Sequence, residues 1–220
     1  DMLIAIGCPL IHNNVLYNTA FIIFEGKILG IVPKSYIPNY SEFYEKRWFT
    51  AAAMLTDELV TLPFQENIPF GTNLIFAAGD YKFGIEICED LWVTIPPSSY
   101  LSLLGANIIG NLSASNELVS KKDYRLSLIA NQSARCMSSY IYSSAGVHES
   151  TTDLLFSGHL VISENGTILK ENNRFQRENE VITSCIDVFK LNAERLKNLS
   201  YRDSSKIVPF KPKNINFNFK

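Results

Sequence analysis

Short apolar runs of strand type recur along the whole chain, and turn residues separate them. Asn13-Asn14 is a turn signal between two such runs near the N-terminus. Glu25-Gly26 joins the second run to a third, and Asn165-Gly166 joins two more, as in β-hairpins. Between these hairpins, strand-like and helical patterns alternate. Such a chain is restricted to a layered α/β fold, in which sheets pack on each other and helices lie outside.

The same patterns predict the individual elements. Strands are predicted at 3–8, 19–24, 28–32, 73–78, 82–87, 107–112, 140–144, 159–163, 167–170 and 181–188. Helices are predicted at 98–104, 121–137 and 191–199, and the second is the clearest because its apolar residues cover a broad face. After residue 199 no helical period remains. We therefore expect one domain over 1–199 and an extended tail over 200–220 that packs on another surface.

Charge and apolar content exclude several classes of protein. Lys and Arg number 20 against 22 Asp and Glu, so the net charge is −2 and the basic excess of a nucleic-acid-binding protein is missing. No run of about 18 apolar residues occurs, and the N-terminus lacks the basic start of a signal peptide. We therefore expect no nucleic-acid partner, no membrane span and a cytoplasmic location.

The four cysteines are too far apart for a zinc site. The nearest pair, Cys88 and Cys136, is separated by 48 positions, and none of the three histidines has metal-ligand spacing. We therefore expect no metal site, and free thiols rather than disulfides.

Cys88 is the candidate nucleophile. It ends a predicted strand and is followed by Glu89 and Asp90, and the carboxyl ends of strands are where α/β proteins place reactive groups. The alternative is an ordinary core cysteine. A working thiol needs a cation or base nearby, and Lys34, at the end of another predicted strand, is a candidate for that cation. The alternative for Lys34 is an exposed surface lysine.

Two longer motifs carry a resemblance to a known family. Residues 32–47 read VPKSYIPNYSEFYEKR, and residues 86–92 read EICEDLW. They resemble the lysine and nucleophile segments of the glutaminase domain of glutamine-dependent NAD⁺ synthetases. Residues 111–115, 149–153 and 164–166 fit the same family, so the similarity runs from about residue 3 to 200.

The resemblance implies a fold and a reaction. The fold is the α/β/β/α nitrilase-like sandwich of carbon-nitrogen hydrolases, here lacking its first strands and helices. Cys88 is expected to attack the side-chain amide of glutamine and form a thioester. Lys34 is expected to stabilise the oxyanion and the thiolate, and Glu45 to orient the site. The family's triad glutamate belongs upstream of the strand at 3–8, and no glutamate precedes Glu25 here.

The resemblance also implies a pocket for glutamine. Tyr40, Glu89 and Ser115 are expected to hold its α-amino and carboxylate ends. A basic residue is expected where Lys121 stands, although relatives tend to have arginine there, and lysine lacks arginine's bidentate fork.

The chain looks like a fragment, a partial glutaminase domain cut at both ends. We expect no cofactor in it, whereas ATP, Mg²⁺ and deamido-NAD are expected for an absent synthetase domain of the same protein. That domain and glutamine are the expected partners, the full protein is expected to be a homo-oligomer, and the fragment alone is expected to be inactive. Two alternatives remain open: a non-catalytic nitrilase-fold scaffold, and another nitrilase-superfamily amidase. The occurrence of Lys34 and Cys88 in full motif context favours the glutaminase over the first. Tyr40 and the EDLW run favour it over the second.

Overall fold

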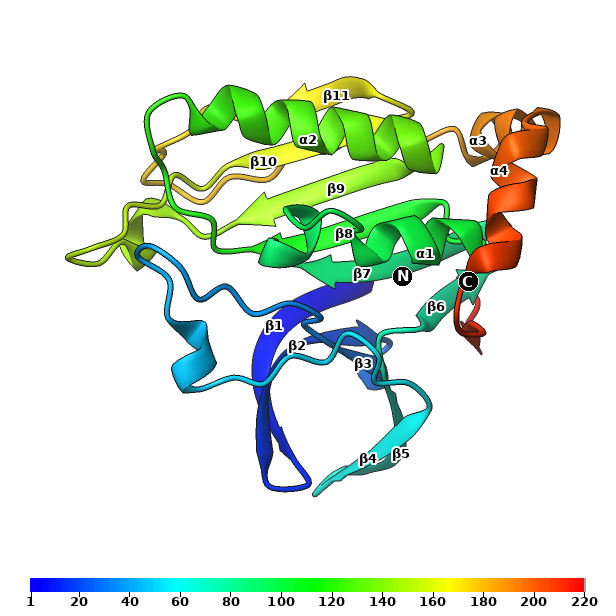
Figure 1. Ribbon diagram of the computed structural model, residues 1–220, viewed down its shortest axis with the longest axis horizontal. Coiled ribbons are helices and arrows are strands. Elements are labelled where there is room, and N and C mark those ends of the chain that lie inside the picture. Colours follow the sequence, from blue (N-terminus) through cyan, green and yellow to red (C-terminus); the bar gives the residue numbers. More distant parts are fainter. Residues whose placement is uncertain (220) are drawn as a thin grey trace.

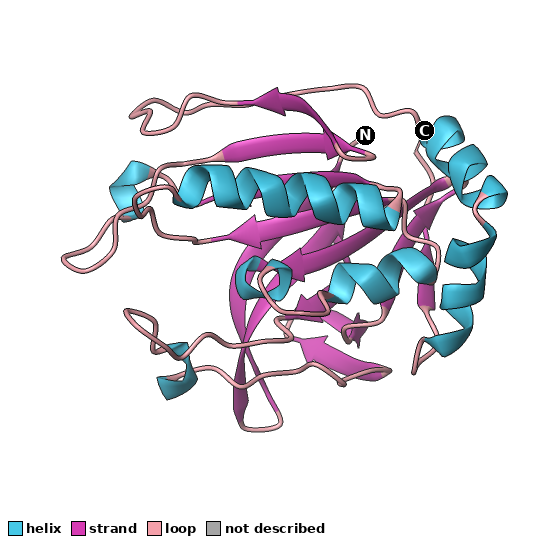
Figure 2. Ribbon diagram, turned by 45° about the horizontal axis from the view of Figure 1, so that its top comes forward, coloured by secondary structure: helices cyan, strands magenta, loops and turns pink. Residues whose placement is uncertain are grey.

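The structure is a computed structural model that describes residues 1–219. Two β-sheets pack face to face, and helices cover the outer face of the larger one (Figures 1 and 2). This three-layer arrangement confirms the predicted α/β sandwich. None of the helices among the described residues has the length and apolar character needed to cross a membrane.

The smaller sheet is built mainly from hairpins near the N-terminus. In spatial order its strands are β1 (Leu3–His12), β2 (Val15–Phe24), β3 (Lys27–Pro33), β5 (Gln65–Phe70) and β4 (Glu58–Leu62). β1 pairs with β2 through the Asn13-Asn14 turn, and β2 pairs with β3 through Glu25-Gly26, both antiparallel. The second of these hairpins was predicted, and the first forms at the predicted turn. The hairpin of β4 and β5 was not predicted, because Glu66, Asn67 and Pro69 interrupt the apolar alternation of β5.

The larger sheet has a parallel centre. In spatial order its strands are β11 (Thr167–Glu171), β10 (Leu160–Glu164), β9 (Ser139–Ser144), β8 (Ile108–Ser113), β7 (Tyr81–Ile87), β6 (Leu74–Ala78) and β12 (Lys213–Asn216). β7, β8 and β9 run parallel, so their carboxyl ends meet at one edge of the sheet. Residues that follow these strands can therefore share a site, although they lie far apart in the sequence.

The main core lies between the two sheets. β2 contributes Ala20, Ile22 and Phe24, which pack against β6 and β7. Gly30 on β3 permits the close approach, since a Cβ there would lie 3.0 Å from side-chain atoms of Leu74 and Phe76. Burial of these apolar faces fixes which side of each strand is turned inward.

The helices form the third layer. α1 (Pro97–Leu103) and α2 (Lys121–Cys136) pack on the outer face of the larger sheet, with Leu101 and Ile129 buried against β6, β8 and β9. α3 (Val188–Lys197) and α4 (Leu199–Ser204) follow at one end of the sheet (Figure 1). The strand predicted over 181–188 is wrong. Val181, Ile182 and Thr183 have strand propensity, but no neighbouring strand pairs with them, so this stretch is irregular and α3 begins at Val188.

The segment after residue 199 folds within this domain. α4 is helical, β12 adds to the edge of β6 in parallel, and the rings of Phe217 and Phe24 lie 4.9 Å apart in the core. The prediction of an extended tail that packs on another surface is therefore wrong for residues 200–219. The edge of β6 supplies hydrogen-bond partners for the backbone of β12, and the ring of Phe217 is buried between the sheets. Lys220 lies outside the described residues, and a synthetase domain beyond it stays a prediction.

Candidate active site

Cys88 lies directly after β7, where the parallel strands of the larger sheet end. It begins a short 3-10 turn, Cys88–Leu91, with a φ of +50° that is rare for a residue with a side chain. Its backbone N–H donates to Asn111 Oδ1 at 3.2 Å, and Asn111 Nδ2 donates to Tyr140 Oη at 3.0 Å. Neighbouring strands thus hold the cysteine in a strained conformation, as is common for functional residues.

Lys34 is buried, with 1% of its surface exposed, so the interpretation as a surface lysine is wrong. It follows the last residue of β3, and its backbone N–H donates to Asn18 O at 2.8 Å. Its Nζ donates to Glu45 Oε2 at 2.7 Å. A buried ammonium is costly without a partner, so this ion pair keeps the charged lysine inside the protein.

Lys34, Glu45 and Cys88 line one cavity of about 360 Å³. Its walls also include residues at the carboxyl ends of β7, β8 and β9, together with Gly7 and Thr19 from β1 and β2. Lys34 follows β3 of the smaller sheet and Cys88 follows β7 of the larger sheet, so the two residues come from facing sheets and meet at this cavity. A thiol can attack an amide carbonyl, and a nearby cation can stabilise the oxyanion that then forms. This cavity brings both groups together.

Asp90 connects the two segments that carry the lysine and the cysteine. Its Oδ1 accepts from Tyr36 N at 2.9 Å, and its Oδ2 accepts from Ile87 N at 2.9 Å and from Ser35 N at 3.4 Å. Burial raises the pKa of Asp90 to about 7, with Glu86 adding to the effect. The sequence indicated Asp90 only as part of a motif, since two of its three backbone partners lie 54 and 55 positions away.

A second cavity, of about 410 Å³, also reaches Cys88. Tyr40, Glu89, Ser115 and Lys121 line it, so the structure brings together all four residues expected to hold glutamine. Tyr40 Oη donates to both carboxylate oxygens of Glu89 at 3.0 Å. Cys88 therefore lies where the Lys34 cavity and this second cavity meet. The catalytic and binding roles of these residues stay predictions.

Burial shifts the pKa values of several residues that line the second cavity. It is the main cause that raises the pKa of Glu89, and with the Glu89 charge it raises the pKa of Tyr40 above its ordinary value. Burial is also the main cause that lowers the pKa of Lys121, and the nearby Arg125 adds to that effect. The Lys121 ammonium lies 5.1 Å from the centroid of the Trp92 ring and 5.7 Å from that of Phe43.

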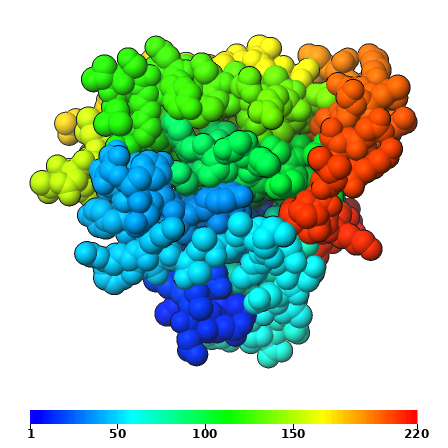
Figure 3. Space-filling view, viewed as in Figure 1, coloured from blue at the N-terminus to red at the C-terminus, as the bar shows by residue number. Residues whose placement is uncertain are grey.

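Asn116 connects two residues that line the second cavity and come from different segments of the chain. Its Nδ2 donates to Glu42, and its Oδ1 accepts from Lys121. The segment 35–48, light blue in Figure 3, consequently lies against the green segment that leads into α2. Asn116 was not predicted as a site residue, because nothing in its local sequence shows that Glu42 comes near.

No group of three histidine, cysteine, aspartate or glutamate side chains within residues 1–219 is arranged to hold a metal ion. The four cysteines are free thiols, of which Cys88 and Cys136 are buried and Cys185 is exposed.

The chain was compared with known proteins. The carbon-nitrogen hydrolase family matches residues 1–193. A glutamine-dependent NAD(+) synthetase of Mycobacterium bovis is 40% identical over 205 residues, which are 91% of this chain and 30% of that protein. The chain thus spans about a third of the length of the curated relatives that it matches.

Solved structures show the same fold. A glutamine-dependent NAD(+) synthetase from Cytophaga hutchinsonii superposes with a TM-score of 0.68 at 25% identity, over 81% of this chain and 29% of that one. A carbon-nitrogen hydrolase from Helicobacter pylori superposes with a TM-score of 0.72 at 18% identity, over 92% of this chain and 68% of that one. The fold, the family match over most of the chain and the placement of Cys88 agree, and the chain belongs to the carbon-nitrogen hydrolase family.

Proposed function

We propose that this chain is most of the glutaminase unit of a glutamine-dependent NAD⁺ synthetase, and that Cys88 hydrolyses the side-chain amide of glutamine. One observation carries the proposal. Cys88 lies between a cavity that holds the Lys34 ammonium and a cavity lined by Tyr40, Glu89, Ser115 and Lys121. The first suits a reacting amide, and the second suits the charged α-carbon end of an amino acid.

The chemistry follows from these positions. The Cys88 sulfur attacks the amide carbon and forms a C–S bond, while the carbonyl oxygen becomes an oxyanion beside the Lys34 ammonium. A general base takes the thiol proton and returns it to the amide nitrogen. The C–N bond then breaks, and ammonia leaves a γ-glutamyl thioester. Water attacks this thioester and releases glutamate, which restores the Cys88 thiol.

Glu45 and a second carboxylate have separate tasks in this proposal. Glu45 accepts a hydrogen bond from the Lys34 ammonium at 2.7 Å and so orients it. Because Glu45 is the ion-pair partner of Lys34, it is not the general base. The proton transfers fall to the triad glutamate that the family resemblance places on a segment upstream of β1. Without that base, the 220-residue chain is inactive alone.

The charged end of glutamine fits the second cavity. The Glu89 carboxylate, with Tyr40 as its hydrogen-bond partner, suits an α-ammonium group. The Lys121 ammonium and the Ser115 hydroxyl suit an α-carboxylate. A lysine makes this contact as a point charge rather than as a fork.

The remaining parts of the proposal concern the whole protein. The ammonia serves the amidation of deamido-NAD to NAD⁺ in a synthetase domain of the same protein, with ATP and Mg²⁺ bound there. This chain needs no cofactor for its own step. The whole protein works as a homo-oligomer in the cytoplasm. The names of the relatives at 40% identity, glutamine-dependent NAD(+) synthetases, support the synthetase part of this proposal.

Replacement of cysteines in the full-length protein tests the function. Cys88→Ser should abolish ammonia release from glutamine, whereas Cys185→Ser, which changes an exposed thiol, should leave it unchanged. Added ammonia should restore NAD⁺ synthesis in Cys88→Ser, because it bypasses the glutaminase step. Release of ammonia from a different amide but not from glutamine would assign another amidase activity. Activity that survives Cys88→Ser would remove the nucleophile assignment.

A further inference from the structure

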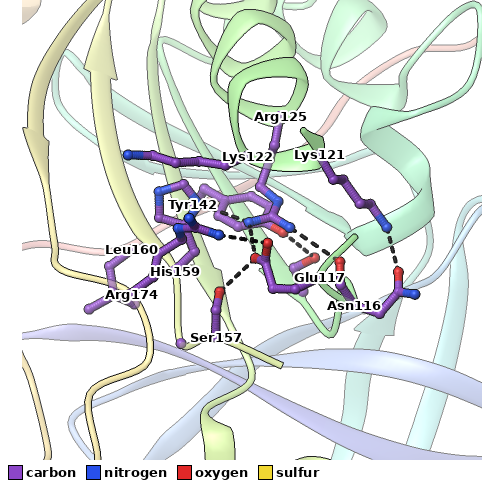
Figure 4. A network of polar contacts seen from close by, with 12 residues as sticks. Asn116, Glu117, Lys121, Lys122, Arg125, Tyr142, Ser157, His159, Leu160 and Arg174 are labelled. Atoms are coloured by element: carbon purple, nitrogen blue, oxygen red, sulfur yellow. Dashed lines mark hydrogen bonds and ion pairs between the residues drawn. The ribbon is translucent and has the colours of Figure 1, made fainter. Parts of the chain in front are cut away.

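A buried ion-pair network lies beneath the wall of the second cavity. Its centre is Arg125 on α2, which is completely buried. Arg125 Nη1 donates to Glu117 Oε1 at 2.6 Å and to His159 Nδ1 at 2.9 Å, and Nη2 donates to Asn116 O at 3.3 Å (Figure 4). The proposed mechanism gives these groups no task, although burying such charges is costly.

The network holds an irregular segment in place. Residues 114–120 connect β8 to α2 without regular structure, yet Ser115 and Asn116 are buried. Glu117 anchors the segment through its backbone N–H, which donates to Leu155 O at 2.7 Å, and through its side chain, which also accepts from Ser157 Oγ at 2.6 Å. A segment without its own hydrogen-bond ladder owes its conformation to such contacts.

The charges of the network are fixed by its geometry. A guanidinium group only donates hydrogen bonds, so His159 Nδ1 accepts and Nε2 carries the proton toward Glu171, at 3.1 Å. Burial and the Arg125 charge lower the pKa of His159, which agrees with a neutral ring. Burial by itself would raise the pKa of Glu117, but the bonds from Ser157 and Arg125 bring it below its usual value. Arg125 and Glu117 are therefore a charged pair, extended by a neutral histidine.

The anchored segment bears half of the proposed glutamine contacts. Ser115 lies within the segment 114–120, Lys121 follows it directly, and Asn116 connects it to Glu42 and Lys121. Lys121 and Arg125 are one helical turn apart at the start of α2, so they lie on the same face of the helix. The contacts of Arg125 with residues 116 and 117 are therefore made close to Lys121, which lines the cavity. Lys34 and Glu45 have no contact with this network in the described residues.

We propose that Arg125 and Glu117 are positioning residues for glutamine recognition: they hold residues 115–121 so that Ser115 and Lys121 meet the α-carbon end of the substrate. This inference rests on the proposed glutaminase function. According to this inference, the network affects the affinity for glutamine and not the chemical step at the amide.

Arg125→Lys is the main test, in the full-length protein. Lysine keeps the charge but cannot reach Glu117, His159 and the Asn116 carbonyl together. We expect the Kd for glutamine, measured by calorimetry in a Cys88→Ser background, to rise about tenfold or more. When Arg125→Lys is made in the protein that retains Cys88, the KM for glutamine should rise by a similar factor, and kcat should stay within about threefold of the wild-type value. NAD⁺ synthesis from added ammonia should stay unchanged, and circular dichroism should show a folded protein.

Arg174→Gln is the matched control. Arg174 Nη1 also pairs with Glu117, at 2.8 Å from Oε2, but it lies nearer the surface and does not contact residues 114–116 in the described structure. Its KM for glutamine should change less than about twofold. If Arg125→Lys does not fold, Glu117→Gln decides by the same Kd measurement, because it keeps the shape of the pair and removes one charge.

Different results separate the two proposals. Folded Arg125→Lys with an unchanged Kd, or a loss of kcat at unchanged KM, would overturn the positioning role. Equal effects of Arg125→Lys and Arg174→Gln would also overturn it, since they would reflect general loss of charge. A wild-type protein that neither binds glutamine nor releases ammonia from it would instead overturn the proposed function.

Discussion

The carboxylate of Asp90 accepts a hydrogen bond from the backbone N–H of Tyr36 at 2.9 Å, across a separation of 54 positions. The same side chain accepts from Ile87 N, the residue before the candidate nucleophile. One buried carboxyl group thus joins the segment that carries Lys34 to the turn that begins at Cys88.

Asp90→Asn should remove a pH dependence of stability. The folded-state pKa of about 7 lies above the ordinary value of 3.8, so between about pH 4 and 7 the folded state binds more protons than the unfolded state. The contribution of Asp90 to the free energy of unfolding is therefore greatest below pH 4 and falls by up to about 1.4 kcal/mol per pH unit across this window. Urea unfolding of both proteins at several pH values measures it. A wild type that becomes more stable relative to Asp90→Asn as the pH rises from 4 to 7 would contradict the expectation.

Glu45→Gln should impair the reaction more than substrate binding. It removes the carboxylate that orients the buried Lys34 ammonium, so kcat for ammonia release should fall about 10²-fold or more. The KM for glutamine should change little, because Glu45 lines the Lys34 cavity rather than the second cavity. Glu58→Gln, which breaks the His12 contact on the smaller sheet, is the control and should keep kcat. An unchanged kcat in Glu45→Gln would show that Lys34 needs no such partner.

The 220-residue chain by itself should hydrolyse glutamine at least about 10²-fold more slowly than the full-length protein. The physical reason is the proposed upstream glutamate, without which no positioned base takes the Cys88 proton. Coupled detection of ammonia with equal concentrations of both proteins measures the ratio, and the chain with Cys88→Ser gives the background. Comparable rates would mean that another carboxylate, such as Glu45 or Glu89, serves as the base.

Phe217→Ala should destabilise the domain by about 3 kcal/mol, as for other buried aromatic residues. The ring packs with Phe24 between the sheets, next to β12. Phe219→Ala is the control, because Phe219 is 43% exposed and should cost clearly less. Thermal unfolding of wild type, Phe217→Ala and Phe219→Ala gives the order of their stabilities. Equal stability of wild type and Phe217→Ala would show that the chain around Phe217 is not part of the core.

Local patterns predicted the elements whose partners are close in sequence. The hairpins through Glu25-Gly26 and Asn165-Gly166 form as expected, and Asn13-Asn14 forms the expected turn, because turn residues and apolar alternation act over a few positions. α2 spans Lys121–Cys136, one residue short of the predicted end. The resemblance in residues 32–47 and 86–92 likewise indicated the residues that the structure gathers around Cys88.

Elements with distant partners were predicted less well. The stretch 181–188 has strand propensity but no strand beside it, whereas Lys213–Asn216 becomes a strand because β6 offers an edge. Propensity expresses only the local cost of a conformation, while a strand is stabilised by the neighbour with which it pairs.

The sequence by itself determined the fold class, the family and the identity of the candidate nucleophile and its lysine. Only the tertiary structure decided that Lys34 is buried and paired, that Asp90 joins the segments that carry Lys34 and Cys88, and that Arg125 bonds to the backbone beside the second cavity. The reason is physical. Secondary structure and motifs depend on neighbours along the chain, but the burial and charge of a side chain depend on contacts with distant residues, such as that of Asp90 with Ser35, 55 positions away.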